Sequence, residues 1–332
     1  MVPRGINPAA KLVPNIYDLK TLEQVPTRNG YGTGVVLAGK KDKNIVVLCA
    51  DLSESTRNLD FKKTFPERFV QMGVSEQSLV AIAAGMAVSG EVPFVASYAM
   101  FCPGRAWEQV RTNCALNQAN VKIVGAHSGV SVGPDGATHQ AIEDIAITRV
   151  IPGMTVLVPC DVLETEKVTL AAAVWNGPVY FRFAREKTPV FTTAQTPFAI
   201  GKATTFRFGK DVVIFGCGPV LHNALLAADQ LSKKGIECMV VNLASVKPMD
   251  AKAIIAAAKL CGAAVTIEEH QRQGGMGSRV AEILAQAHPV PIEFLGVDDR
   301  FGESGEPNEL IEAFGMGVKD VVRAVGRVLK RK

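Results

Sequence analysis

Short apolar runs that alternate with helical segments constrain the fold of this chain more than any other feature. Residues 44–50 (NIVVLCA), 92–98 and 121–127 are rich in β-branched residues, as expected of buried strands. Helical patterns separate these runs, and the same alternation returns after residue 210. Strands that alternate with helices predict an α/β fold with mostly parallel sheets covered on both faces.

The length of 332 residues exceeds that of one typical domain and predicts two consecutive α/β domains. We place the first at residues 15–188 and the second at residues 210–332. A segment rich in Thr and Pro, residues 189–209, would link them. Residues 1–25 carry three prolines and little periodicity, which predicts an irregular lead-in.

The composition excludes several classes of protein. With 48% hydrophobic and 20% charged residues, the chain is expected to be a soluble globular protein without a membrane span. The net charge of +4 is small and the basic residues are dispersed, which argues against nucleic acid as a partner. Seven scattered cysteines without a CxxC pair favour reduced thiols in the cytoplasm over disulfides or a zinc site.

The segment at residues 121–140, VKIVGAHSGVSVGPDGATHQ, is the strongest candidate for a site. Its strand ends at His127, and a glycine-rich loop follows that carries Asp135 and His139. Ligands of open α/β sheets bind beyond the carboxyl ends of the strands. Two of the chain's five histidines lie in this loop, which favours a functional loop over an ordinary turn with surface histidines.

Other polar and aromatic residues are expected near the same edge of the sheet. Asp51 and Ser55 follow the strand at residues 44–50. Glu76 opens a helix at residues 76–89, where by position alone it could merely complement the helix dipole. Tyr98 and Phe101 lie at a strand end, where packing in the core is the default role for aromatic residues.

Eight motifs, in order, resemble the C-terminal two-thirds of transketolase: TRNGYG, ADLSEST, FPERFVQMGVSEQSLVAIAAGMA, SYAMFCPGRAWEQVR, GPDGATHQAIEDIA, RFAREKTP, IEEHQRQGGMGS and RFGESGEPNEL. The resemblance covers nearly the whole chain. It implies a pyrimidine-binding domain followed by a transketolase C-terminal domain. The chain is similar to the second subunit of a split transketolase.

The resemblance implies thiamine diphosphate as the cofactor. Glu76 matches the glutamate that bonds ring nitrogen 1′ of the aminopyrimidine and so promotes proton removal at the thiazolium. Phe101 and Tyr98 would pack on the pyrimidine ring. Asp51 would lie next to the cofactor.

The resemblance also implies substrate contacts and a reaction. The positions that would hold the sugar phosphate are Arg28, Ser55, His127 and Arg185. Asp135 and His139 would bond hydroxyl groups near the reacting carbon, and His127 and His139 join Glu76 as catalytic candidates. The implied reaction transfers a two-carbon ketol unit between ketose and aldose phosphates, as in the pentose phosphate pathway.

Some positions depart from the family pattern. Gln77 stands where the family often has His, Ala137 where it often has Pro, and Gly104 where many members have Tyr. These changes leave the implied cofactor chemistry intact, but the motifs no longer indicate which acceptor sugar is preferred.

One family motif is missing from the sequence. Full-length transketolases carry a GDG triplet followed by Asn, which supplies Mg²⁺ ligands, and the nearest triplet here, in GPDGATHQ, belongs to another element. This chain is therefore expected to hold no metal itself. Mg²⁺ and the diphosphate would be held mainly by a separate N-terminal subunit. Two copies of each would form the active enzyme.

Three alternatives stay open. Deoxyxylulose-phosphate synthases share DGxTHQ and GGxGS, and β subunits of 2-oxoacid dehydrogenases share the size and domain order. The latter usually carry HS in place of THQ and lack FGESG, which favours transketolase. A non-catalytic paralogue that binds a partner or a metabolite is disfavoured because Glu76, His127, Asp135 and His139 are all retained.

Overall fold

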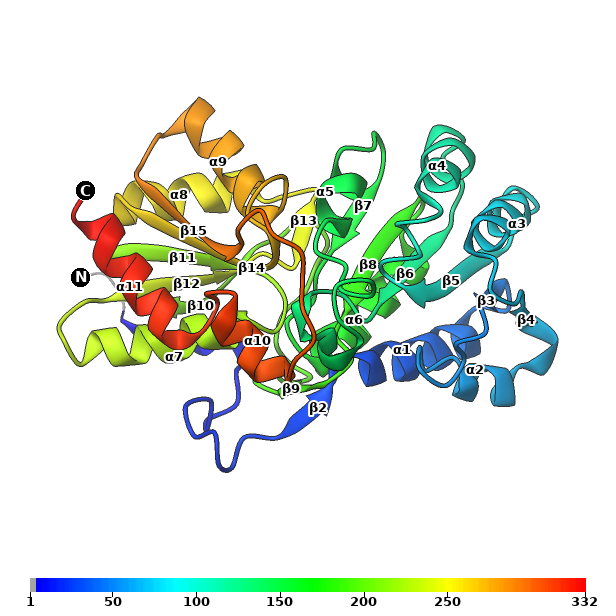
Figure 1. Ribbon diagram of the computed structural model, residues 1–332, viewed down its shortest axis with the longest axis horizontal. Helices are drawn as coiled ribbons and strands as arrows, with labels where there is room; N and C mark the ends of the chain where they lie inside the picture. The colour runs from blue at the N-terminus through cyan, green and yellow to red at the C-terminus, as the bar shows by residue number, and fades with distance from the viewer. Residues whose placement is uncertain (1–3) are drawn as a thin grey trace.

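Two α/β units lie side by side, each built on its own central sheet (Figure 1). The computed structural model describes residues 4–332, so the first three residues of the expected lead-in lie outside it. The mostly parallel sheets confirm the predicted fold class. In the described part of the chain no helix is long and apolar enough to cross a membrane.

The first unit contains a seven-stranded sheet that is parallel except at one edge strand. Its order is β13 (Ser245–Lys247), β7 (Thr155–Leu157), β8 (Val179–Phe183), β6 (Lys122–Ala126), β5 (Val92–Tyr98), β3 (Ile45–Cys49) and β4 (Phe69–Gln71). The central strands are buried along their length, as strands covered on both faces must be.

Helices cover both faces of this sheet. On one face lie α1 (Thr27–Lys41), α2 (Leu59–Thr64) and α6 (Val162–Val174). On the other lie α3 (Glu76–Val88), α4 (Trp107–Gln109) and the π-helix Val110–Leu116. Two glycines let α1 and α6 pack closely, since a Cβ at Gly30 or Gly34 would collide with atoms of α6. The short helix α5 (Asp144–Arg149) leads into β7.

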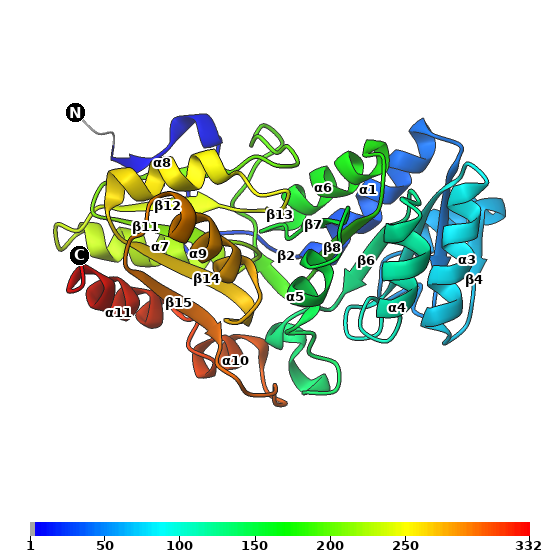
Figure 2. The same ribbon diagram turned by 90° about the horizontal axis from the view of Figure 1, so that it is seen from above.

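The second unit contains a six-stranded mixed sheet. Its order is β1 (Gly5–Ile6), β10 (Thr204–Phe208), β12 (Cys238–Asn242), β11 (Val212–Gly216), β14 (Ala264–Gln271) and β15 (Ile292–Val297). Its helices are α7 (Leu221–Ser232), α8 (Ala251–Cys261), α9 (Met276–Ala287), α10 (Pro307–Ala313) and α11 (Val318–Leu329). Figure 2 shows α8 and α9 together over one part of this sheet.

The two units are joined by backbone pairing as well as by apolar packing. β13 comes from the second half of the sequence but pairs with β7 of the first sheet. The Lys247 ammonium donates to the carbonyl oxygens of Arg149 and Ile151, at 2.8 and 2.5 Å. In a separate two-stranded antiparallel sheet, β2 (Gln24–Pro26) pairs with β9 (Lys187–Pro189) and so joins the start of the first unit to its end.

The structure corrects several local expectations. The segment expected to be a linker contains β10, whose pairing with β12 lies beyond any local pattern, and the expected lead-in supplies β1. Helix α5 begins only at Asp144, after the bridge between Ala141 and Ser128. Ser75 precedes α3, but its hydroxyl makes no capping hydrogen bond. The domain boundaries themselves remain a prediction.

Candidate active site

The candidate site lies at the carboxyl ends of β3, β5, β6 and β8, neighbouring strands in the middle of the seven-stranded sheet. Because these strands are parallel neighbours, the loops that follow them leave the sheet at the same edge. These loops and the starts of two helices carry the residues that the sequence singled out: Arg28, Asp51, Ser55, Glu76, Tyr98, Phe101, His127, Asp135, His139 and Arg185.

Glu76 is the first residue of α3, and only 2% of its surface is exposed. Its Oε1 accepts a hydrogen bond from the buried Ser97 hydroxyl at 3.3 Å. Its Oε2 lies 3.4 Å from Nη1 of Arg105, an exposed side chain. The sequence analysis singled out neither Ser97 nor Arg105. Both lie in the segment SYAMFCPGR, from which it selected only the aromatic residues Tyr98 and Phe101. Such burial exceeds what a simple dipole effect on an exposed first turn requires.

Four rings gather around the end of β5. Tyr98 stacks on the imidazole of His127 with ring centroids 4.1 Å apart, and on Phe101 at 6.3 Å. The His139 ring meets Phe101 edge-on at 5.3 Å. The structure thus brings together the two predicted aromatic residues and the two predicted histidines. The flat faces of this ring cluster, Tyr98, Phe101, His127 and His139, suit a planar heterocycle.

His127 is buried at the end of β6 in a left-handed backbone conformation, with φ of +57°. Burial lowers the pKa of His127 to about 3, and positive charges nearby add to the effect: Arg28, Arg185, Arg57 and His139. The imidazole is therefore neutral near pH 7 and can both donate and accept a hydrogen bond. Its Nδ1 is buried without a protein partner.

Two arginines approach the site from α1 and from the loop after β3. Arg28 donates from Nη1 to the Ser55 carbonyl at 3.2 Å, and its buried Nε has no partner. Arg57, which sequence reasoning missed, donates from Nε to the Asn29 Oδ1 at 2.9 Å. Its place two residues after Ser55 was the signal that could have revealed it. The structure thus brings Arg28 to Ser55 through the backbone carbonyl rather than the hydroxyl.

Two other predicted residues pair with each other, and one lies apart. Arg185 Nη1 contacts Asp135 Oδ1 at 3.0 Å, although the sequence assigned Arg185 to phosphate and Asp135 to hydroxyl groups. This pair leaves the Arg185 guanidinium partly neutralised before any ligand binds. Asp51 is exposed, and its N–H donates to the Gln71 amide oxygen at 2.8 Å rather than to any residue of the ring cluster.

The orphaned atoms indicate a ligand. Nearly all buried polar atoms in native proteins have hydrogen-bond partners, so the Nδ1 of His127 and the Nε of Arg28 point to a missing acceptor or donor. The buried Glu76 carboxylate, whose partner Arg105 lies over the Phe101 ring at 5.5 Å, fits an aminopyrimidine. Within residues 4–332 no three His, Cys, Asp or Glu side chains gather as a metal site.

Two family models match this chain and together cover most of it. Residues 23–190 match the transketolase pyrimidine binding domain, and residues 201–321 match the transketolase C-terminal domain. The chain belongs to the transketolase family. Within this family the chain matches the pyrimidine-binding and C-terminal domains, as subunits of split transketolases do.

Three similar proteins show how much of a transketolase this chain matches. A split-gene transketolase solved as an inactive beta4 tetramer is 42% identical with a TM-score of 0.86, and the match covers 93% of this chain and all of that one. A 6-deoxy-6-sulfo-D-fructose transketolase subunit from Clostridium sp. (strain MSTE9) is 38% identical over 94% of this chain and 97% of its own length. Transketolase-like protein 2 of Mus musculus is also 38% identical, but the match spans 91% of this chain and only 48% of the mouse protein.

Proposed function

We propose that this chain carries the pyrimidine half of a thiamine-diphosphate-dependent transketolase. With a separate diphosphate-binding subunit it transfers a two-carbon ketol unit between ketose and aldose phosphates. The observation that carries the proposal is the buried Glu76 carboxylate, which Arg105 links to the Phe101 ring of the ring cluster. Membership of the transketolase family implies dependence on thiamine diphosphate.

The cofactor half of the site would work through four residues of this chain. Bound thiamine diphosphate supplies an electron sink for making and breaking a carbon–carbon bond beside a carbonyl group. Glu76 would hold a proton between its carboxylate and ring nitrogen 1′, while the Ser97 hydroxyl fixes the orientation of that carboxylate. Tyr98 and Phe101 would cover the ring and exclude water.

The substrate half of the site would bind a sugar phosphate. The neutral His127 imidazole donates one hydrogen bond, and the free Nε of Arg28 donates another. Arg57 adds a second positive charge, beside that of Arg28, near His127. Arg185, which pairs with Asp135, would also reach the phosphate, and Asp135 and His139 lie on the loop that would meet the sugar hydroxyls. Sugars of the pentose phosphate pathway are the proposed substrates.

The other half of the cofactor site would come from a partner. The near full-length matches to a transketolase subunit and to a split-gene transketolase support a separate diphosphate-binding subunit, and so does the absence of a GDG triplet from residues 1–332. We expect the partner to hold Mg²⁺ and the diphosphate. Two copies of each subunit would assemble, because related cofactor sites lie between units.

Reconstitution tests this function. The chain is mixed with a diphosphate-binding transketolase subunit, Mg²⁺ and thiamine diphosphate, and ketol transfer from a ketose phosphate to an aldose phosphate is measured. Transfer should require both subunits. A reconstituted complex that decarboxylates a 2-oxoacid but transfers no ketol unit would contradict the proposal and favour the 2-oxoacid dehydrogenase or deoxyxylulose-phosphate synthase alternative.

A further inference from the structure

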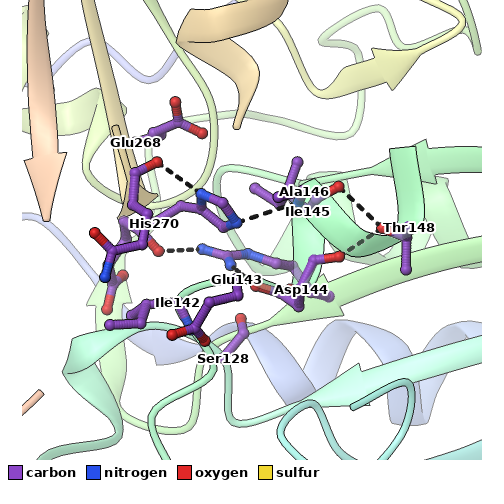
Figure 3. Close-up of polar contacts among 12 residues, drawn as sticks. Ser128, Ile142, Glu143, Asp144, Ile145, Ala146, Thr148, Glu268 and His270 are labelled. Carbon is purple, nitrogen blue, oxygen red and sulfur yellow. Dashed lines mark hydrogen bonds and ion pairs between the residues drawn. The ribbon is translucent and has the colours of Figure 1, made fainter. Parts of the chain in front are cut away.

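Three consecutive ionisable residues near the end of β14 are buried, and each faces a different neighbour. Glu268 accepts hydrogen bonds from the N–H groups of Met276 and Gly277, at 2.7 and 2.8 Å, and so caps the start of α9. His270 accepts from the Ala146 N–H at 3.3 Å, across the junction of the two units (Figure 3). These two residues stabilise a helix start and the junction.

Glu269, between them, reaches the loop of the candidate active site. Its Oε1 accepts a hydrogen bond from the Ser131 N–H at 2.5 Å. A Cβ at Gly129 would lie 2.4 Å from the same oxygen, and Gly129 has a φ of +83° that other residues rarely adopt. The loop is therefore fitted tightly around this carboxylate. Ser131 lies between His127 and Asp135 in the sequence.

The backbone of Glu269 is itself fixed. Arg182 donates from Nη2 to the Glu269 carbonyl at 2.7 Å and from Nη1 to the Asp144 carboxylate at 2.7 Å. The Tyr180 hydroxyl donates to the other oxygen of Asp144. All four residues are buried. The carboxylate that meets the loop is thus attached to a rigid network rather than to a mobile side chain.

The C-terminal unit also supports the far side of the same loop. The Gln140 amide donates to the Glu303 carbonyl and to the Val130 carbonyl, both at 2.9 Å. A Cβ at Gly136 would lie 2.5 Å from the Ser304 hydroxyl oxygen. The segment from Gly129 to Gln140 is therefore held between β14 on one side and residues 302–307 on the other.

We propose that Glu269 is a positioning residue for the active site. Its carboxylate fixes residues 129–136 and thereby sets the positions of His127 and Asp135, so the C-terminal unit shapes a substrate site that it does not line. The contact itself is independent of the reaction. The consequence for substrate binding rests on the proposed function.

Hydrogen exchange in the full-length chain alone tests the contact. In Glu269→Ala the amide of Ser131 and the loop at residues 129–136 should exchange at least tenfold faster than in the wild type. Glu268→Ala is the matched control, because it removes an equally buried neighbouring carboxylate. Faster exchange there should be confined to the start of α9. Unchanged exchange of residues 129–136 in Glu269→Ala would overturn the proposal.

Kinetics of the complex with the partner subunit test the consequence. Glu269→Ala should raise the KM for a phosphorylated donor about tenfold, with a smaller change in kcat, since it displaces groups that bind substrate. Glu269→Gln keeps an acceptor for the Ser131 N–H and should restore most of the affinity. Glu268→Gln should lower the melting temperature without moving KM.

The outcomes separate the two proposals. A Glu269→Ala complex with a lower melting temperature but the wild-type KM would show that Glu269 is only a structural residue, and would overturn the positioning role. The same KM change in Glu268→Gln would also overturn it. A wild-type complex without ketol transfer would defeat the proposed function instead, and hydrogen exchange would still decide whether Glu269 holds the loop.

Discussion

The ends of β6 and β14 contain similar residues but differ in how their polar atoms are satisfied. At β6, the buried Nδ1 of His127 and the nearby Nε of Arg28 have no partners. At β14, Glu268 and Glu269 accept hydrogen bonds from backbone N–H groups, and both nitrogens of His270 are bonded. At these two strand ends, the unpartnered nitrogens lie at the proposed ligand site, and the bonded carboxylates belong to its support. Mutations at the two places should therefore have different effects.

Glu76→Gln should have the largest effect on activity. Ser97 can still bond the amide, so the fold should persist, but the proton shared with the cofactor ring is lost. Proton transfer by a positioned group contributes about 10²–10⁴-fold to rates. We expect kcat of the reconstituted complex to fall by about that factor. Turnover close to the wild type, with melting temperature unchanged, would remove Glu76 from the mechanism.

Arg182→Met should affect stability, because Arg182 belongs to the support. The substitution leaves the buried Asp144 carboxylate without its ion pair, which costs about 3–5 kcal/mol of unfolding free energy. Arg279→Met is the control, since Arg279 pairs with Glu282 at the surface and such pairs contribute about 0–1 kcal/mol. Urea unfolding measures both. Equal losses in the two variants would contradict the assignment of Arg182 to a buried supporting network.

Arg28→Ala and Arg185→Ala should weaken binding of phosphorylated donors. Each charge-assisted hydrogen bond contributes about 1.5–3 kcal/mol, so KM for a ketose phosphate should rise about tenfold or more. KM for hydroxypyruvate, which has no phosphate, should change much less and serves as the internal control. Arg185→Ala should have the smaller effect, since Arg185 already pairs with Asp135. Parallel losses on both donors would make these arginines structural.

His127→Gln should have the smallest effect on stability at pH 7 and appear as a change in the pH dependence of stability. The pKa of His127 is lowered to about 3 in the folded chain, from an ordinary value of 6.5, so the unfolded chain takes up the proton first. The stability from neutral His127 is therefore present above pH 6.5 and is lost as the pH falls. Between about pH 7 and 5 the wild type should lose about 2 kcal/mol relative to the variant. Parallel stability curves would show that His127 is not held neutral.

Local patterns predicted the buried strands well. The strands predicted at residues 44–50 and 92–98 form at Ile45–Cys49 and Val92–Tyr98, because continuous apolar runs need cover on both faces. β13 could not be found locally, since its partner β7 belongs to the other unit. The amphipathic α11 was overlooked although its apolar residues recur with a helical period.

The site was only partly visible in the sequence. Motifs brought out Glu76, the histidines and the aromatic residues, and the fold places the four rings in one cluster. Ser97, Arg57 and Arg105 act through contacts that only the fold creates. The Glu269–Ser131 contact joins residues 138 positions apart, so no local pattern could predict it. Asp51 stays a prediction without a contact to the cluster.

Titration of thiamine diphosphate and Mg²⁺ into the purified chain by calorimetry tests the central claim most directly. The chain is proposed to hold only the pyrimidine half of the cofactor site, so it should bind the cofactor weakly or not at all without a partner. Adding the diphosphate-binding subunit should produce tight, Mg²⁺-dependent binding together with ketol transfer. Tight, Mg²⁺-dependent binding and ketol transfer by the chain alone would contradict the account of a split enzyme.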